Sequence, residues 1–439
     1  MPRKGVGTRP VEVLCPVSRV RYTALVNSLI ESLPPASRQE RSWSEHTMFG
    51  ESGDHTHVVE IDFTSCYEFI DHADLRRELS LRSFDYDAIS KLMETVLGVG
   101  HHGRGLPQML EASDRLADTY LSIVDRQLTR RGHPIHRYAD DIRVLASNWE
   151  SANEIIETTA SVGRSLGLVL SSEKTSIRLK ETIAASNRSR TASIIAALDL
   201  STTDPTDFDF GPYSEPPQPS SEDTSAQLTE SMKRILSDWQ AKFSESRKIQ
   251  GGYPRKTDID FLVSPAVILL SDNEEELESQ LVADLAFDSP LRSEIICRYF
   301  ILRNQKGLTV SDALFARATE ASERSPWSKL WLLHTARDLG VSSPDIVTWA
   351  RKQLNDSHEI VRAEALWTLA LLDDLSLDEV SRLYRSATRV STPALAAATA
   401  YWNNKTGSKE SQRLSGALDG DSLLNRKASQ WARSLTQKS

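Results

Sequence analysis

The sequence is poor in cysteine and in long apolar runs. Its 439 residues contain only 3 cysteines, which stand far apart at Cys15, Cys66 and Cys297. This spacing encodes neither a disulfide framework nor a zinc knuckle, so a reducing compartment fits the composition. No apolar run is long enough to cross a bilayer, and residues 1–7 lack the apolar core of a signal peptide. We therefore expect a cytoplasmic protein with no membrane association.

Positive charge is also scarce. The chain carries 52 Lys and Arg against 61 Asp and Glu, which gives a net charge of -9 at pH 7. Because phosphate binding draws mainly on clustered Lys and Arg, this balance argues weakly against a surface coated with nucleic acid. The contents of 39% hydrophobic and 26% charged residues are those of a soluble globular protein. A chain of this length has room for two or three domains.

Composition divides the chain into three parts. Residues 1–195 mix short β-branched runs with helical stretches, which is typical of an α+β domain. Residues 196–226 are rich in Pro, Ser, Thr and Asp, and their prolines exclude regular helix and central strand, so we expect a linker there. Residues 227–439 have a helical pattern throughout and begin with an amphipathic stripe.

The helical part contains an internal repeat. Helix starts are predicted near Ser289, Ser325, Ser357 and Ser391, because Ser is a favoured N-cap. A second helix in each unit starts with Asp and ends with Arg, and the leading residues Asp312, Asp345 and Asp378 are 33 apart both times. Two helices per unit at this period predict a stacked solenoid of the HEAT type, with a concave surface for a partner.

Three acidic residues stand where two-metal chemistry would need them. Asp62 follows a strand-like run at residues 57–61. Asp140 and Asp141 occupy the turn of a hairpin-like segment at residues 135–146. Extending a nucleic acid requires a 3'-hydroxyl to lose its proton and a leaving pyrophosphate to be neutralised, and two Mg²⁺ ions held by carboxylates serve both ends. Paired acids at a turn are more often simply solvated. The motifs around them must therefore show whether these acids bind metal.

Four segments follow one another in a characteristic order. They are residues 62–72, with Asp62 and Tyr67; residues 105–121, opening with Gly105-Leu106-Pro107-Gln108; residues 138–141, Tyr138-Ala139-Asp140-Asp141; and residues 166–175, with Lys174. In this order and spacing they resemble the palm motifs of reverse transcriptases. The resemblance covers about the first 180 residues. It implies an RNA-directed DNA polymerase, a nucleotidyltransferase that adds deoxynucleotides with two Mg²⁺ ions, or with Mn²⁺ in their place.

The resemblance assigns catalytic roles to four residues. Asp62 and Asp140 would bind both metal ions. Asp141 would either bind metal as well or contact the residues that do. Lys174 would give a proton to the leaving pyrophosphate as a general acid.

The resemblance also assigns nucleotide-binding roles. Tyr67 would stack under the sugar and exclude a 2'-hydroxyl, although a buried core aromatic is compatible with the same pattern. Gln108 would contact the incoming nucleotide. Lys4 and Arg9 lie in a stretch that resembles the basic finger hairpin, and they would bind phosphates. Surface cations without a role are an equally good reading of these two residues.

Two features depart from the family pattern. Met109 follows Gln108 where the family usually has Gly, and a side chain there would narrow the groove for template or nucleotide. After Lys174 we recognise no thumb, RNase H, integrase or maturase signature in the sequence. A retroviral or intron-mobility role is therefore not expected.

A compact palm followed by helical repeats resembles the bacterial abortive-infection and defence-associated reverse transcriptases. In that group a HEAT-like domain takes the place of the thumb, some members make DNA without a template, and a protein tyrosine can prime synthesis. The resemblance implies antiviral defence, with deoxynucleoside triphosphates as substrates and single-stranded DNA as product, and it leaves an RNA template and a homo-oligomer open. Candidate priming residues are Tyr213, Tyr253, Tyr299, Tyr384 and Tyr401, for each of which ordinary packing is the favoured reading.

Two other functions stay open at this point. One is a retron-like or other templated cellular reverse transcriptase. The other is a nucleic-acid-binding module on a polymerase fold, which the complete set of three aspartates and Lys174 disfavours. The histidines His101, His102, His133 and His136 lack cysteines or acids at metal-ligand spacing, so zinc is not expected.

Overall fold

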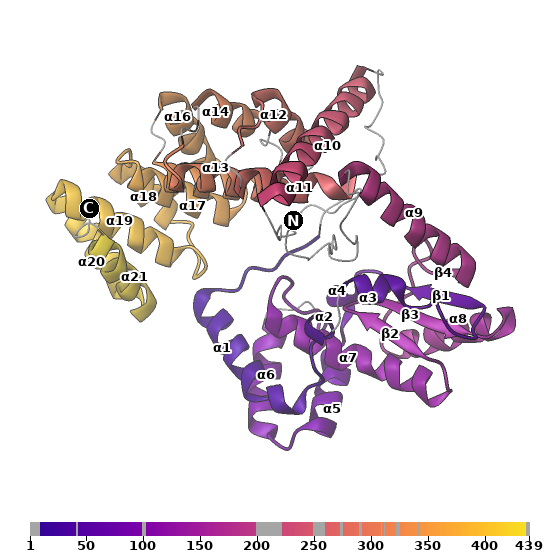
Figure 1. Ribbon diagram of the computed structural model, residues 1–439. Helices are drawn as coiled ribbons and strands as arrows, with labels where there is room; N and C mark the ends of the chain where they lie inside the picture. The colour runs from indigo at the N-terminus through magenta and orange to yellow at the C-terminus, as the bar shows by residue number, and fades with distance from the viewer. Residues whose placement is uncertain are drawn as a thin grey trace. The chain divides into compact units, whose positions relative to one another are not determined.

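The chain folds into two compact units. A computed structural model describes residues 9–40, 43–98, 102–198, 222–248, 260–272, 275–288, 292–308, 310, 312–321, 325–340 and 343–435. The first unit, here the palm unit, comprises Pro10–Ala196, and the second, here the helical unit, is described from Glu222 to Leu435 (Figure 1). Most of the expected linker at residues 196–226 lies outside the described residues, so its boundaries stay a prediction.

The palm unit is built on a four-stranded antiparallel sheet. Its strands are β1 (His57–Ile61), β2 (Ile135–Tyr138), β3 (Asp141–Ala146) and β4 (Ser176–Leu179), in the order β2-β3-β1-β4. The register of β1 and β3 pairs Val59 with Val144 and Ile61 with Ile142. Because side chains alternate between the faces of a strand, these four buried residues share one face and form part of the core.

Helices supply the rest of the palm unit. They are α1 (Pro16–Ser28), α2 (Ser37–Glu40), α3 (Trp43–Met48), α4 (Cys66–Phe69), α5 (His72–Arg82), α6 (Tyr86–Leu97), α7 (Glu111–Arg130), α8 (Trp149–Ser165) and α9 (Lys180–Leu198), with the 3-10 turn η1 (Ile30–Ser32). α8 packs on β1 and β3, and α7 packs on β2 and α8. α7 is amphipathic because Leu116, Tyr120 and Val124 recur every four residues, and all three join the core.

Every element of the helical unit in the described residues is a helix. They are α10 (Glu222–Lys248), α11 (Asp260–Asp272), α12 (Ser279–Asp288), α13 (Ser293–Gln305), α14 (Asp312–Ala321), α15 (Pro326–Leu339), α16 (Pro344–Lys352), α17 (Glu359–Leu371), α18 (Leu377–Tyr384), α19 (Thr392–Thr406), α20 (Lys409–Asp421) and α21 (Leu423–Leu435), with the 3-10 turn η4 (Gln353–Asn355). This confirms the predicted fold class, an α+β domain followed by an all-helical region. Among the described residues no helix combines the length and the apolar character that a membrane span requires.

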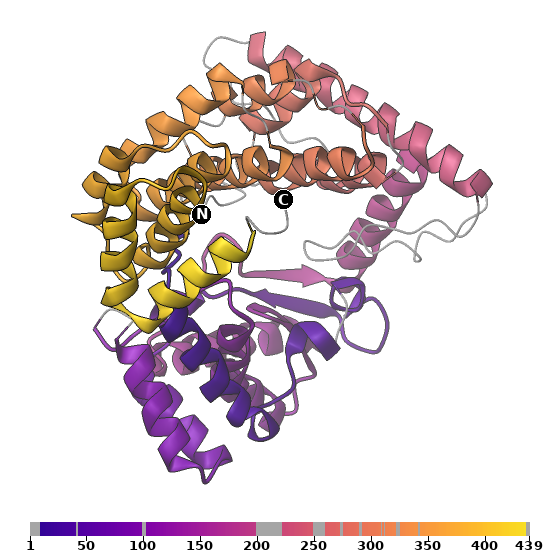
Figure 2. The same cartoon turned by 90° about the vertical axis from the view of Figure 1, so that its left-hand side faces the viewer.

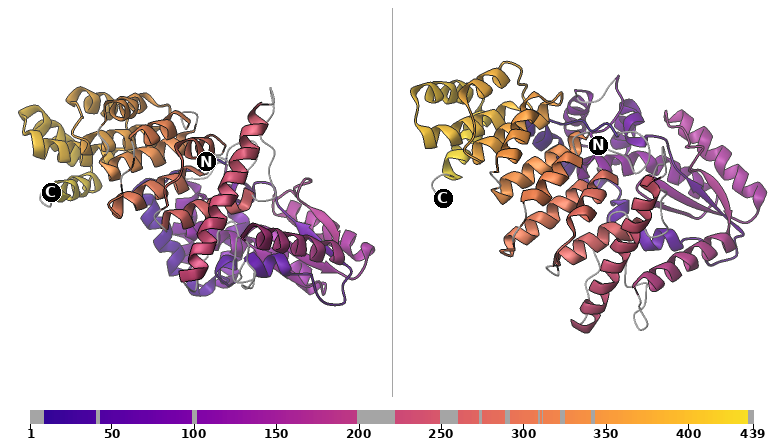
Figure 3. Two further views of the ribbon diagram at one scale, coloured as in Figure 1. Left: turned by 45° about the horizontal axis from the view of Figure 1, so that its top comes forward. Right: turned by 90° about the horizontal axis from the view of Figure 1, so that it is seen from above.

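The helices of the second unit stack in two layers. α11, α13, α15, α17, α19 and α21 each pack on the next of this series, and α12 packs on α14, which packs on α16. Consecutive helices of the first series lie next to one another in space, as the change of colour from red through orange to yellow shows in Figure 2. The right-hand view of Figure 3 shows the same row of helices from above. Each helix pair therefore buries its apolar face against its neighbours, as a solenoid requires.

The helix starts agree with most of the expected positions. Ser325 caps α15, and its side chain accepts a hydrogen bond from the backbone N–H of Ser328. α19 begins one residue after Ser391, and α17 two residues after Ser357. Ser289 lies outside the described residues. The pairing of helices thus follows the sequence repeat, while its assignment to the HEAT type stays a prediction.

Candidate active site

The three aspartates singled out from the sequence lie at one end of adjacent strands. Asp141 is the first residue of β3, and Asp140 belongs to the two-residue turn that joins β2 to β3. Asp62 directly follows β1. Because Ile61 pairs with Ile142 in the antiparallel ladder, the next step of the register sets Asp62 opposite Asp141. Sequence positions almost 80 residues apart are thus brought together by the pairing of β1 with β3.

The three carboxylates repel one another. Asp62 is only 6% exposed. Burial raises its pKa, Lys174 acts in the opposite direction, and the charge of Asp140 adds to the rise. Burial and the charges of Asp140 and Asp62 raise the pKa of Asp141 to about 6. The site therefore concentrates negative charge in a partly dehydrated place, where a cation would be strongly favoured.

The positive group at this place in the structure is the ammonium of Lys174. Its Nζ donates a hydrogen bond of 2.8 Å to Asp62 Oδ1. Burial lowers the pKa of Lys174, but the hydrogen bond to Asp62 and the charges of the aspartates outweigh burial and raise it. Lys174 therefore carries its proton at neutral pH, as a general acid must.

Backbone hydrogen bonds hold the lysine segment beside Asp62. The N–H of Ser171 donates to the Asp62 carbonyl at 2.8 Å, and the N–H of Thr64 donates to the Val169 carbonyl at 2.9 Å. The two segments thus pair across the end of β1. This pairing explains how a lysine more than 100 residues downstream reaches the first aspartate.

The donor set suits a hard divalent cation. Three carboxylates supply only oxygen ligands, which Mg²⁺ and Mn²⁺ prefer, and their mutual repulsion would fall on binding a cation. Among the described residues, however, no three Asp, Glu, His or Cys side chains stand in an arrangement that encloses a metal ion. The ammonium of Lys174 occupies one oxygen of Asp62. The chemistry of the donors therefore fits a metal, and the ligand roles of the three aspartates stay predictions.

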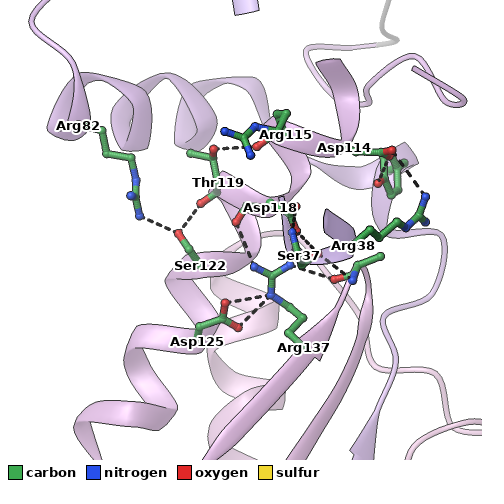
Figure 4. A network of polar contacts seen from close by, with 12 residues as sticks. Ser37, Arg38, Arg82, Asp114, Arg115, Asp118, Thr119, Ser122, Asp125 and Arg137 are labelled. Carbon is green, nitrogen blue, oxygen red and sulfur yellow. Dashed lines mark hydrogen bonds and ion pairs between the residues drawn. The ribbon is translucent and has the colours of Figure 1, made fainter. Parts of the chain in front are cut away.

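Buried polar side chains fix the turn that carries Asp140. Three of them, Ser37, Asp118 and Arg137, are drawn in Figure 4. Ala139 has a φ of 58°, a left-handed conformation uncommon outside glycine. Its N–H donates to Ser37 Oγ at 3.0 Å, and its carbonyl accepts from Arg137 Nη1 at 3.0 Å. Ser37 in turn donates to Asp118 Oδ1 at 2.8 Å, and Arg137 forms a buried ion pair with Asp118. Side chains from α2 and α7 thus set the conformation of the turn.

Tyr67 lies in α4, next to the aspartates. Its hydroxyl donates a hydrogen bond of 2.6 Å to Asp114 Oδ1. Burial raises the pKa of Tyr67 well above its usual value of 10, and the charge and hydrogen bond of Asp114 add to the rise. The charge of Asp140 makes a smaller contribution in the same direction, and that of Arg38 opposes it. Tyr67 is therefore a neutral, fixed hydrogen-bond donor.

The structure gives less support to the other three predicted nucleotide-binding residues. Gln108 is partly buried in the segment that precedes α7. Arg9 is partly buried as well, and it groups with the helical unit and not with the palm unit. Lys4 lies outside the described residues. The roles of all three stay predictions.

The sequence reasoning missed the residues that support the site. Asp114 and Asp118 are four apart on α7 and so share one helical face, which is a recognisable signal. Arg137 directly precedes the Tyr138–Asp141 box. Ser37 and Arg38 belong to a helix of 4 residues with no pattern of its own, so no signal in the sequence points to them.

Comparison with known families gives the class of the first unit. Residues 1–210 match the family described as Reverse transcriptase (RNA-dependent DNA polymerase). The match includes Asp62, Asp140, Asp141 and Lys174. Residues 1–210 therefore match a reverse transcriptase domain, and domains of this family are nucleotidyltransferases. Such domains generally use divalent metal ions, and they imply nucleotide substrates and a nucleic-acid template or product.

Comparisons with individual proteins add little. No curated protein matches the sequence. Among solved structures, a telomerase from Candida albicans in complex with a TWJ fragment of telomeric RNA is similar at 12% identity, with a TM-score of 0.27. The likeness covers 81% of this chain, which spans 58% of the telomerase chain. Values this low support no inference from the telomerase, so the assignment depends on the family match.

Proposed function

We propose that this protein is an RNA-directed DNA polymerase that adds deoxynucleotides by two-metal phosphoryl transfer. The observation that carries the proposal is the convergence of Asp62, Asp140 and Asp141 at one end of the sheet, with Lys174 Nζ 2.8 Å from Asp62. The three carboxylates repel one another, which opposes folding, and the ammonium of Lys174 offsets only part of their charge. Sites that keep such unfavourable charge are commonly functional.

Each residue has a defined part in the proposed reaction. Asp62, Asp140 and Asp141 would hold two divalent ions, Mg²⁺ or Mn²⁺. When bound, the ions would supply the positive charge that activates the 3'-hydroxyl and neutralises the leaving pyrophosphate. Lys174 would hold a proton at Nζ and give it to the pyrophosphate, which is consistent with the raised pKa of its ammonium.

Four further residues would bind the incoming nucleotide. Tyr67 would lie under the sugar and leave no room for a 2'-hydroxyl. Gln108 would contact the nucleotide, and Lys4 and Arg9 would bind its phosphates. Tyr67 has the best structural support of the four, because it directly follows the Asp62 segment in α4 and a hydrogen bond to Asp114 fixes its hydroxyl.

For the finer assignment we propose a bacterial defence-associated reverse transcriptase with HEAT-like repeats. A compact palm unit followed by stacked helix pairs supports this choice, although support from architecture alone is an analogy. Template-independent synthesis from a protein tyrosine belongs to the same proposal. Tyr213 and Tyr253 lie outside the described residues. Tyr299 is 1% exposed and Tyr401 7%, so packing accounts for both, whereas the hydroxyl of Tyr384 donates to Asp421 near the surface.

The test is incorporation of labelled deoxynucleotides by the purified chain. Wild type and an Asp140→Asn/Asp141→Asn double variant are incubated with Mg²⁺, with and without an RNA template and DNA primer, and products are separated on a denaturing gel. The Asn variant keeps the shape of the site and removes the charge. We expect incorporation by the wild type and a loss of at least about a hundredfold in the variant, because metal-binding carboxylates are indispensable to two-metal chemistry.

The outcomes separate the alternatives. Product that needs the template indicates a retron-like or other templated cellular enzyme. Label that forms without template and stays with the protein until protease treatment supports self-primed synthesis. Incorporation that the double variant retains in full, or no incorporation under any condition together with tight binding of nucleic acid, would favour the binding module.

A further inference from the structure

The side chain of Tyr67 is fixed at both ends. Its hydroxyl donates to Asp114 Oδ1 at 2.6 Å. Its backbone carbonyl accepts a hydrogen bond of 2.8 Å from the N–H of Leu106, and the preceding Cys66 is buried in the core at 2% exposure. A tyrosine with an anchored backbone and a bonded hydroxyl has few rotamers left. The position of its ring is therefore set by Asp114 as much as by packing.

Asp114 is itself held in place from two sides. It lies in the first turn of α7, and the neighbouring Ser113 shares a buried hydrogen bond of 2.9 Å with the hydroxyl of Tyr22 in α1. Arg38 Nη1 lies 3.6 Å from Asp114 Oδ2, the carboxylate oxygen that Tyr67 does not contact (Figure 4 shows Arg38 beside Asp114). The side chain of Asp114 is 32% exposed, so its hydrogen bond to Tyr67 is part-buried.

We propose that Asp114 is a positioning residue that sets the discrimination between deoxyribonucleoside and ribonucleoside triphosphates. It does so by fixing the ring of Tyr67 against the sugar of the bound nucleotide. The inference rests on the proposed function, because it takes the substrate to be a nucleoside triphosphate bound beside the three aspartates.

Discrimination between deoxyribonucleotides and ribonucleotides requires that the ring of Tyr67 be held rigidly. The two kinds of nucleotide differ by one hydroxyl, and a pocket rejects an added hydroxyl only weakly when its wall can yield. Without a partner at Asp114, the hydroxyl of Tyr67 would lose its hydrogen bond and the ring could rotate away from the sugar. The ribonucleotide would then gain affinity, while binding of the deoxynucleotide would change little.

A purely structural role for Asp114 makes a different prediction. As an acid in the first turn of α7, it also stabilises the helix N-terminus. Loss of that effect lowers the free energy of unfolding and leaves the ratio of the two nucleotide affinities unchanged. The ratio therefore separates the two roles.

The experiment compares dATP with ATP on the full chain. Binding of each nucleotide is measured by isothermal titration calorimetry with Ca²⁺ present, and single-nucleotide incorporation is measured with Mg²⁺. The variants are Asp114→Ala, Asp114→Asn, Tyr67→Phe and the double variant Tyr67→Phe/Asp114→Ala. Asp87→Ala is the matched control, because Asp87 is an exposed acid in the first turn of α6 that forms an ion pair with Lys91.

We expect Asp114→Ala and Tyr67→Phe each to reduce the preference for dATP about tenfold, the usual effect of losing one hydrogen bond to a charged partner. The double variant should lose no more than either single variant, because both remove the same bond. Asp114→Asn, whose amide oxygen can still accept from Tyr67, should stay within about threefold of wild type, as should the control.

The inference is overturned if Asp114→Ala keeps the full preference or if the two single effects multiply in the double variant. Equal binding of dATP and ATP by the wild type would also overturn it. The proposed function can fail independently of this inference. A wild type that incorporates no nucleotide can still bind dATP and ATP with different affinities, and the ratio of these affinities then tests the role of Asp114.

Discussion

At the scale of single residues, the most informative charge is that of Asp141. Its pKa is raised from 3.8 to about 6 by burial and by the charges of Asp140 and Asp62. The folded state therefore binds this proton more tightly than the unfolded state does. As pH rises from about 4 to about 6 the stabilising contribution of the proton is lost, and above that range the ionised carboxylate destabilises the fold.

We expect Asp141→Asn to stabilise the metal-free protein at pH 7. The gain should be about 1–3 kcal/mol in the free energy of unfolding, because the amide carries no charge. It should be smaller at pH 5, where the wild-type carboxyl is mostly protonated in the folded state. Urea denaturation in EDTA at both pH values measures the gain, with Asp87→Asn as an exposed control. Destabilisation at pH 7, or a gain independent of pH, would contradict the assignment.

Some features of single residues could not be read from the sequence. Met109 stands where the family usually has Gly, and the groove-narrowing effect expected of its side chain stays a prediction. In the structure Met109 has a φ of 66° and is 54% exposed. This left-handed backbone accounts for glycine as the common choice at such a place, since glycine adopts it without strain. Backbone dihedrals of this kind depend on tertiary contacts, which no local pattern encodes.

At the scale of elements, the β2–β3 turn is the part whose geometry matters most. Its strands and turn were predictable because β-branched residues flank Asp140 and Asp141, with Ile135 before them and the alternating Ile142 and Val144 after them. Its support was not predictable, because it comes from α2, about 100 residues away in the sequence, and from polar residues of α7. Such long-range hydrogen bonds leave no periodic signal. The sequence therefore indicated the hairpin and its acids, but not what holds them in register.

Removal of the Ser37 hydroxyl should disturb this turn. In Ser37→Ala the N–H of Ala139 loses its acceptor in a buried place, which costs about 1–3 kcal/mol of stability. We also expect a lower kcat for deoxynucleotide incorporation with a smaller change in KM, since Asp140 moves while the nucleotide-binding residues do not. Denaturant titration and steady-state kinetics measure the two effects.

A second substitution tests whether the effect passes through the turn. Ala139→Gly relieves the left-handed strain at that residue, so combining it with Ser37→Ala should restore part of the lost kcat. The control is Ser28→Ala, which removes an exposed hydroxyl bonded only within α1. If Ser37→Ala lowers stability but leaves kcat unchanged, Ser37 has only a packing role.

At the scale of the whole molecule, the order of domains was predictable and their function only in part. The change from β-branched runs to helical repeats marked an α+β unit followed by a helical one, and the family match over residues 1–210 agrees with it. The motifs identified the class of chemistry because catalysis constrains residue types and spacing. The defence role has no comparable constraint, since a stacked helical surface is compatible with many partners.

Division into two compact units predicts two separate unfolding transitions. Leu116 in α7 and Leu333 in α15 are both fully buried, at 0% exposure, in the cores of the palm and helical units. Truncating each to Ala should cost about 2–5 kcal/mol within its own unit. By differential scanning calorimetry, Leu116→Ala should lower the midpoint of one transition and Leu333→Ala that of the other, each by roughly 5–15 °C. If both variants lower the same transition equally, the units unfold as one cooperative body, and the helical unit then contributes directly to the stability of the catalytic site.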